Sequence, residues 1–74
     1  MTVVKEYISQ KKVAILGYNA DGQYVAKSLR DSGVPVVIGL REGDPYWEEA
    51  EKDGFTVNNL IAAVDQADII QVWY

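Results

Sequence analysis

The chain contains neither cysteine nor histidine. Without cysteine it has no disulfide, no thiolate nucleophile and no zinc site of the usual cysteine type. Without histidine it lacks imidazole acid–base chemistry and most transition-metal sites. These two absences count against an enzyme that works alone, and we expect no catalytic residues and no metal site.

Basic charge and long apolar runs are also scarce. Seven Lys and Arg residues face eleven Asp and Glu residues, which gives a net charge of −4. Such a surface lacks the attraction to phosphate that nucleic-acid binding needs. No apolar run approaches the roughly 20 residues of a membrane span, and residues 1–5 do not resemble a signal peptide. We therefore expect no nucleic acid or membrane partner, and a soluble protein of the cytoplasmic type.

The 74 residues make up 8.2 kDa, of which 49% are hydrophobic and 24% charged, an ordinary globular composition. This length accommodates one domain over residues 1–74. Residues 1–11 form a leader in which Val3, Val4, Tyr7 and Ile8 have helical spacing.

Four short segments are typical of β-strands. The runs at 13–16 and 35–40 are continuously apolar and rich in β-branched residues, as in parallel strands covered on both faces. The run at 69–74 is similar but carries Gln71, and residues 55–57 are long enough only for a short edge strand.

Helical spacing predicts a helix in each gap between these strands. The first helix spans residues 22–32. The second is capped by Asp44 and ends at Gly54, and the third spans residues 60–66 after Asn59 as N-cap.

Strands that alternate with helices pair in parallel through right-handed crossovers. The sequence therefore predicts an α/β fold, a three-layer Rossmann-like half with a four-stranded parallel sheet in the order 3-2-1-4. The first two helices lie on one face of the sheet and the third on the other.

The first strand leads directly into a glycine turn, Gly-Tyr-Asn-Ala-Asp-Gly at residues 17–22. In a dinucleotide-binding G-x-G-x-x-G turn, the first glycine allows the tight turn and the third allows close packing of helix and strand. Gly17 and Gly22 hold these positions, whereas the second glycine is replaced by Asn19. Asparagine tolerates the left-handed conformation, but its side chain occupies space that a diphosphate needs.

Two further charges bear on a dinucleotide. Asp21 favours the bare N-terminus of the helix but competes with a phosphate for the same amides. Arg41, at the end of the second strand, suits a 2′-phosphate and hence NADP, whereas the nearby Asp44 suits the NAD ribose. Two interpretations of the turn stay open: glycines kept for packing alone, or a working phosphate cradle.

Residues 13–68 resemble the N-terminal NADP-binding domain of ketol-acid reductoisomerase, an NADP- and Mg-dependent enzyme. The resemblance rests on the segments Lys12–Tyr18, Leu29–Gly33, Val37–Gly43, Trp47, Ala50–Phe55 and Ala67–Ile70. In that family the turn usually reads Gly-Tyr-Gly-Ser-Gln-Gly, and the loop after the second strand offers Arg and Ser to the 2′-phosphate. Arg41 matches this Arg, and the resemblance implies that a cofactor contacts Gly17, Tyr18, Asn19, Asp21, Gly22, Arg41 and Asp44.

The departures from the family pattern cluster at this site. Asn19, Ala20 and Asp21 differ within the turn, and Asp44 stands where Ser is expected. The Mg-binding carboxylates and the substrate pocket of the family lie in a helical domain outside this resemblance. We therefore expect a shared fold without reductoisomerase activity, no cofactor or at most weak binding of NADP or NAD, and an engineered, recombinant origin.

The fourth predicted strand lies at one edge of the sheet and ends in large side chains. An edge strand offers unpaired backbone groups to another strand, and Trp and Tyr concentrate binding energy at interfaces. We expect an interface at Gln71, Val72, Trp73 and Tyr74, either in a homodimer or with a designed protein partner. Alternation places Gln71 and Trp73 on a partly exposed face. Tyr18, Tyr24, Tyr46 and Tyr74 fall where surfaces or loop tips are expected.

Four hypotheses about function follow. The first is a non-catalytic engineered module that acts through protein association. The second is a residual NADP- or NAD-binding domain, and the third is a minimal fragment made to study folding. The least favoured is an enzyme of new chemistry in which Asp21, Glu42 and Asp44 bind Mg²⁺.

Overall fold

The structure is a computed structural model that describes residues 11–74. Apart from residue 11, the predicted leader lies outside the described residues. The elements in chain order are β1 (Val13–Leu16), α2 (Ala20–Asp31), β2 (Val36–Gly39), α3 (Trp47–Lys52), β3 (Thr56–Asn58), α4 (Leu60–Gln66) and β4 (Ile69–Val72).

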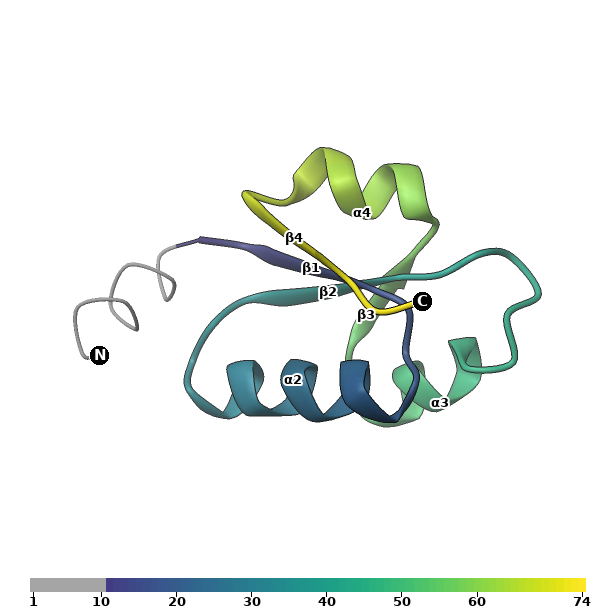
Figure 1. The fold of residues 1–74 in the computed structure, drawn as a ribbon, viewed down its shortest axis with the longest axis horizontal. Helices are drawn as coiled ribbons and strands as arrows, with labels where there is room; N and C mark the ends of the chain where they lie inside the picture. Colours follow the sequence, from purple (N-terminus) through teal and green to yellow (C-terminus); the bar gives the residue numbers. More distant parts are fainter. Residues whose placement is uncertain (1–10) are drawn as a thin grey trace.

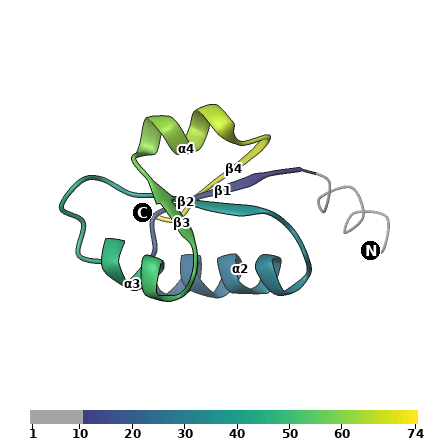
Figure 2. The same cartoon turned by 180° about the vertical axis from the view of Figure 1, so that it is seen from behind.

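The four strands form one parallel sheet in the order β3-β2-β1-β4, which confirms the predicted topology. The chain moves outward from β1 through β2 to β3 and then crosses over to place β4 on the other side of β1. Helices α2 and α3 cover one face of the sheet and α4 the other (Figures 1 and 2). A crevice beyond the carboxyl ends of β1 and its neighbours is where ligands bind in open sheets of this kind.

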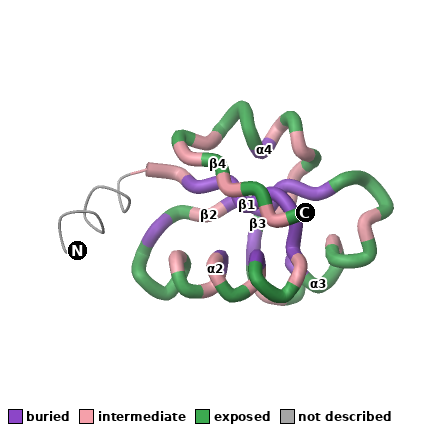
Figure 3. Tube along the Cα trace, viewed as in Figure 1, coloured by how far each residue is buried: buried purple, intermediate pink, exposed green. Residues whose placement is uncertain are grey.

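The core has two parts because side chains alternate along β1. Val13 and Ile15 face α2 and α3, and Ala14 and Leu16 face α4. All four are buried, as the continuous purple of β1 shows (Figure 3). A strand that is buried on both faces reads as an unbroken apolar run, which is why this strand was predicted with its observed bounds.

The close approach of α4 to the sheet depends on two small residues. A Cβ atom placed on Gly39 would lie 2.8 Å from the Cβ of Ala63 and 2.6 Å from Cδ2 of Leu16. Gly39 is therefore a packing position, and it brings the N-terminal end of α4 near the carboxyl ends of β1 and β2.

The helix starts differ from the predicted ones in two places. Helix α2 begins at Ala20, two residues early, because the side chain of Asn19 caps it. Helix α3 begins at Trp47 rather than directly after Asp44, whose Oδ1 accepts a hydrogen bond from the Tyr46 amide at 2.8 Å within a preceding turn. Helix α4 spans the predicted residues, and Asn59 Oδ1 accepts from the Ala62 amide at 2.8 Å.

The two faces of strand β4 differ in exposure. Gln71 and Trp73 are half-buried, whereas Ile70 and Val72 are 45% and 56% exposed. Ile70 pairs with Ala14 and therefore faces the α4 side of the sheet. Helix α4 packs on β2, β1 and β3, so the apolar side of β4 stays uncovered (Figure 3).

Within residues 11–74, no helix is long and apolar enough to cross a membrane.

Candidate functional site

The glycine turn leaves β1 through Gly17, whose φ is +99°. This left-handed conformation is readily adopted only by glycine. A Cβ atom on Gly22 would lie 3.0 Å from the carbonyl oxygen of Gly17. The two glycines thus hold the turn and the start of α2 in close contact, as their predicted packing roles require.

Asn19 does not adopt the left-handed conformation that the sequence allowed. Its φ and ψ are −70° and −179°, and its Oδ1 accepts a hydrogen bond from the Gly22 amide at 2.9 Å. Its Nδ2 donates to the carbonyl oxygen of Trp73. The reason is the helix cap: an N-cap residue takes an extended backbone and turns its side chain onto the first free amides.

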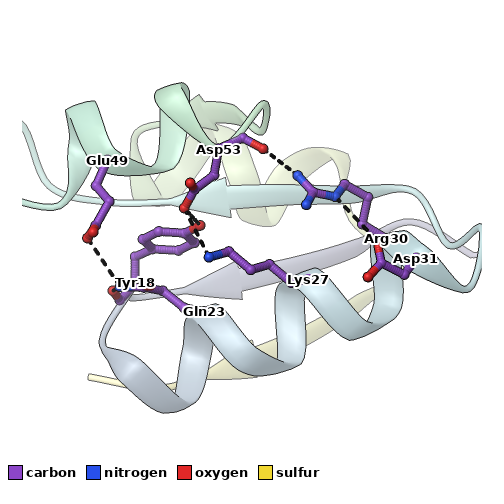
Figure 4. A network of polar contacts seen from close by, with 7 residues as sticks. All are labelled: Tyr18, Gln23, Lys27, Arg30, Asp31, Glu49 and Asp53. Carbon is purple, nitrogen blue, oxygen red and sulfur yellow. Dashed lines mark hydrogen bonds and ion pairs between the residues drawn. The ribbon is translucent and has the colours of Figure 1, made fainter.

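Tyr18 is a core residue and not the surface tyrosine that its place in a loop predicted. It is 1% exposed, and its ring meets Phe55 edge-on with centroids 5.9 Å apart. Its hydroxyl donates to Asp53 Oδ2 at 2.5 Å (Figure 4). Burial, followed by the neighbouring Asp53 carboxylate, raises the pKa of Tyr18 well above its usual range.

The Asp53 carboxylate, half-buried at the end of α3, is the centre of this network. The hydrogen bond from Tyr18 lowers the pKa of Asp53, and Lys27 Nζ lies 3.4 Å from its Oδ2. Arg30 donates to the Asp53 carbonyl oxygen and places its guanidinium carbon 4.5 Å from the centroid of the Phe55 ring.

A second link joins the same two helices nearer the turn. Gln23 Nε2 donates to the Tyr18 carbonyl oxygen at 3.1 Å and to Glu49 Oε2 at 3.2 Å. Sequence reasoning missed this network, although the spacing of Gln23, Lys27 and Arg30 places all three on one face of α2 (Figure 4). Through Gln23, helix α3 is therefore linked to the glycine turn.

A small hollow lies at the carboxyl ends of β1 and β2. Its volume is about 170 Å³, and it is lined by Gly17, Gly39, Leu40, Arg41, Asp44, Leu60 and Tyr74. Three of the predicted cofactor-binding residues, Gly17, Arg41 and Asp44, thus come together. The Arg41 guanidinium carbon lies 5.8 Å from the centroid of the Tyr74 ring.

Other predicted site residues lie apart from this hollow. The side chain of Tyr18 points into the core, and Asp21 is exposed in the first turn of α2. Of the predicted interface residues, Val72 is exposed and Gln71 and Trp73 are half-buried, whereas Tyr74, which is 70% exposed, lines the hollow.

The described residues include no group of three His, Cys, Asp or Glu side chains that could hold a metal ion. The structure therefore does not bring Asp21, Glu42 and Asp44 together as the magnesium hypothesis requires.

The hollow fits the adenosine phosphate of a dinucleotide better than the glycine turn fits the diphosphate. The hollow beside Arg41 offers a cation and apolar walls to an adenosine phosphate. At the turn, the Gly22 amide that a diphosphate would use is already bonded to Asn19, and Asp21 adds negative charge beside it.

The parallel sheet, its strand order and the glycine turn at the end of β1 define a Rossmann-like module of the dinucleotide-binding class. The chain belongs to the family of NADPH-binding domains of acetohydroxy acid isomeroreductases, whose family model matches residues 7–74. This confirms the predicted resemblance.

The curated relatives are ketol-acid reductoisomerases. The enzyme of Methanopyrus kandleri is 46% identical over 67 residues, which are 90% of this chain and 21% of that protein. The enzyme of Pyrococcus abyssi is 44% identical over 70 residues, 95% of this chain and 21% of that protein. The chain therefore spans about a fifth of the length of these relatives.

A solved structure shares the fold. It is an NADH-preferring ketol-acid reductoisomerase from an uncultured archaeon, with a TM-score of 0.89 and 36% identity over 95% of this chain and 23% of that one.

Proposed function

We propose that this chain is a domain of the NADPH-binding fold that is not catalytic by itself. Its diphosphate-binding turn is closed, and its function is to associate with another protein molecule. The observation that carries the proposal of a closed turn is the pair of hydrogen bonds made by the Asn19 side chain, to the Gly22 amide and to the Trp73 carbonyl oxygen. We further propose an engineered origin, for which the support is that the departures from the family pattern at Asn19, Ala20, Asp21 and Asp44 cluster at one site.

The closed turn opposes a diphosphate in two ways. A phosphate oxygen must displace Asn19 Oδ1 before it reaches the backbone amide of Gly22. The side-chain oxygen of Asn19 then loses the hydrogen bond that it accepts from Gly22. The Asp21 carboxylate, exposed in the first turn of α2, repels the same ligand. Each effect lowers affinity without disturbing the fold, because an N-cap and an acidic first turn both stabilise the helix itself.

Reversal of these two changes tests the closed turn. The double variant Asn19→Gly, Asp21→Gln should bind NADP at least tenfold more tightly than the parent in isothermal titration calorimetry. A hydrogen bond from an amide to a charged group is worth about 1.5–3 kcal/mol, which is roughly a factor of ten to one hundred.

The matched control is Asp31→Asn at the other end of α2, which removes the same charge from an exposed carboxylate and should leave the affinity unchanged. Equal affinities of the double variant and the parent for NADP would refute the closed turn.

The absence of catalysis is supported by the extent of the match. The matching family model is that of the NADPH-binding domain, and the chain spans 21% of two relatives that carry the name reductoisomerase. We expect no oxidation of NADPH by a ketol acid above the buffer rate at high protein concentration. A rate proportional to the concentration of the chain would contradict this.

Association is supported by the free edge and uncovered face of β4. Among residues 11–74, the strand pairs only with β1 and lies at one edge of the sheet. On the α4 side it exposes Ile70 and Val72, and α4 itself exposes Val64 and Ile61, at 37% and 75%. We propose a second copy as the partner, with β4 strands pairing antiparallel about a two-fold axis to give an eight-stranded sheet.

The oligomeric state tests this association. Sedimentation equilibrium between 5 and 500 μM (about two decades of concentration, chosen to bracket a micromolar Kd) should show a monomer–dimer equilibrium. Val72→Lys should shift it to monomer because it places a charge on the exposed apolar side of β4 that carries Ile70 and Val72. Thr56→Lys, at an exposed position of the opposite edge strand β3, is the control. A monomer at every concentration would refute the proposed dimer.

The alternative function is residual binding of a dinucleotide, and the hollow beside Arg41 favours it. Arg41 attracts the 2′-phosphate of NADP, whereas Asp44 accepts a hydrogen bond from the ribose hydroxyl of NAD. Millimolar NADP or NAD should then raise the Tm, since a ligand of the folded state stabilises it.

The Arg41→Ala variant should lose the shift in Tm, and Lys52→Ala, an exposed cation at the end of α3, should keep it. The alternative fails if neither coenzyme changes the Tm of the parent.

A further inference from the structure

Residues 73 and 74, here named the 73–74 segment, lie directly over the glycine turn. The Trp73 amide donates to the Leu16 carbonyl oxygen at 2.8 Å, and the Trp73 carbonyl oxygen accepts from Asn19. A Cβ atom on Gly17 would lie 3.2 Å from the carbonyl carbon of Trp73 and 3.2 Å from Cβ of Tyr74. Contact this close means that the backbone of the segment rests on the turn itself.

The same segment reaches the start of α2. A Cβ atom on Gly22 would lie 3.3 Å from Cβ of Trp73, and the Trp73 side chain packs against the core beneath α2. Trp73 is thus an anchor. It ties the segment to the core, to β1 and to the Asn19 side chain at once.

Tyr74 extends from this anchor to the hollow at the ends of β1 and β2. Its ring lies 5.8 Å from the Arg41 guanidinium carbon, within cation–π range. Tyr74 and Arg41 both line the hollow of about 170 Å³. The ring is 70% exposed, so its contact with Arg41 is not enforced by the core.

We propose that the 73–74 segment is autoinhibitory: it competes with an adenosine phosphate for Arg41 and for the space above Gly17. This inference rests on the residual dinucleotide binding described above. A phosphate on Arg41 and a tyrosine ring over Arg41 use the same guanidinium group, and the backbone of Trp73 and Tyr74 fills the space next to Gly17. Asn19 links the 73–74 segment to the closed turn, because its Nδ2 donates to the Trp73 carbonyl oxygen while its Oδ1 accepts from the Gly22 amide.

The test measures the binding of adenosine 2′-phosphate and of NADP to the parent and to Tyr74→Ala by NMR titration. Removal of the ring frees Arg41, so the Kd should fall about two- to fivefold, the factor that an exposed cation–π contact represents. Tyr74→Phe keeps the ring and should bind as the parent does. Tyr24→Ala removes a tyrosine that is 74% exposed on α2, away from the hollow, and should also leave the Kd unchanged.

The contact between the ring and Arg41 has its own readout without ligand. The Arg41 side-chain protons should carry a ring-current shift that disappears in Tyr74→Ala and persists in Tyr74→Phe. Equal or weaker binding by Tyr74→Ala, as expected if the ring stacks on the ligand, would overturn the inhibition alone. If no variant binds either probe, residual dinucleotide binding and inhibition are both refuted, while the proposed association is unaffected.

Discussion

Tyr18→Phe is the most informative single change in this protein, because it removes one oxygen atom and keeps the packing of the ring. Tyr18 is 1% exposed, and its hydroxyl is 2.5 Å from Asp53 Oδ2. Deletion of such a hydroxyl costs about 1–2 kcal/mol, because water reaches the half-buried carboxylate and replaces part of the lost bond.

That loss is large for a domain of this size. At roughly 0.05–0.15 kcal/mol per residue, a domain of this length has a total stability of about 4–11 kcal/mol. The Tm falls by about 4–8 °C for each kcal/mol in domains of 60–100 residues, so we expect a fall of roughly 5–15 °C. Thermal unfolding followed by circular dichroism measures it, with Tyr24→Phe on the exposed face of α2 as the control.

The pH dependence of stability gives an independent check. The pKa of Tyr18 is raised in the folded protein, chiefly by burial. The folded chain therefore keeps a proton that the unfolded chain releases above about pH 10, so stability falls as the pH rises beyond that value. Tyr18→Phe lacks this group, and the difference in stability between it and the parent should narrow above about pH 10.

The acid side has the opposite sign. The pKa of Asp53 is lowered first by the bond from Tyr18, so its contribution to stability is present above about pH 4 and is lost as the pH falls through the lowered pKa. In Tyr18→Phe the pKa of Asp53 should rise toward its usual value, as measured by NMR titration of its carboxyl carbon. A variant with the parent's Tm and an unchanged Asp53 pKa would refute this account of the network.

Two further changes test how α4 packs on the sheet and how it is capped. Gly39→Ala should destabilise the fold by about 1–3 kcal/mol, because the new methyl group overlaps Ala63. Adding Ala63→Gly should recover part of that loss in urea unfolding, and strictly additive losses would show that the overlap is not the cause. Asn59→Ala should cost about 1 kcal/mol through the lost N-cap of α4, and Asn59→Ser should restore most of it. An unchanged Tm in Asn59→Ala would mean that the cap contributes nothing.

Much of the fold follows from short-range patterns in the sequence. The run at Val13–Leu16 is apolar at every position because β1 is covered on both faces, and that pattern is local. Asn59 followed by Leu60 and Ala63 defines both the start and the buried face of α4. The alternation of strands and helices indicates a parallel sheet with right-handed crossovers, and the glycine turn after the first strand favours the 3-2-1-4 order of the dinucleotide-binding fold. The family resemblance likewise rests on residues that are contiguous in the chain.

The details of the site required the tertiary structure, because they depend on partners far apart in the sequence. In the sequence Tyr18 has the pattern of a surface residue in a loop. In the fold its hydroxyl donates a hydrogen bond to Asp53, which is 35 positions away. Asn19 has both a left-handed and a capping option in its own segment, and Trp73, 54 positions away, accepts from its amide in the capping geometry. The sequence alone thus determined the elements and their order, since spacing within a few residues encodes them. Only the tertiary structure shows that Trp73 and Tyr74 cover the glycine turn, since these residues reach the turn only when β4 pairs with β1.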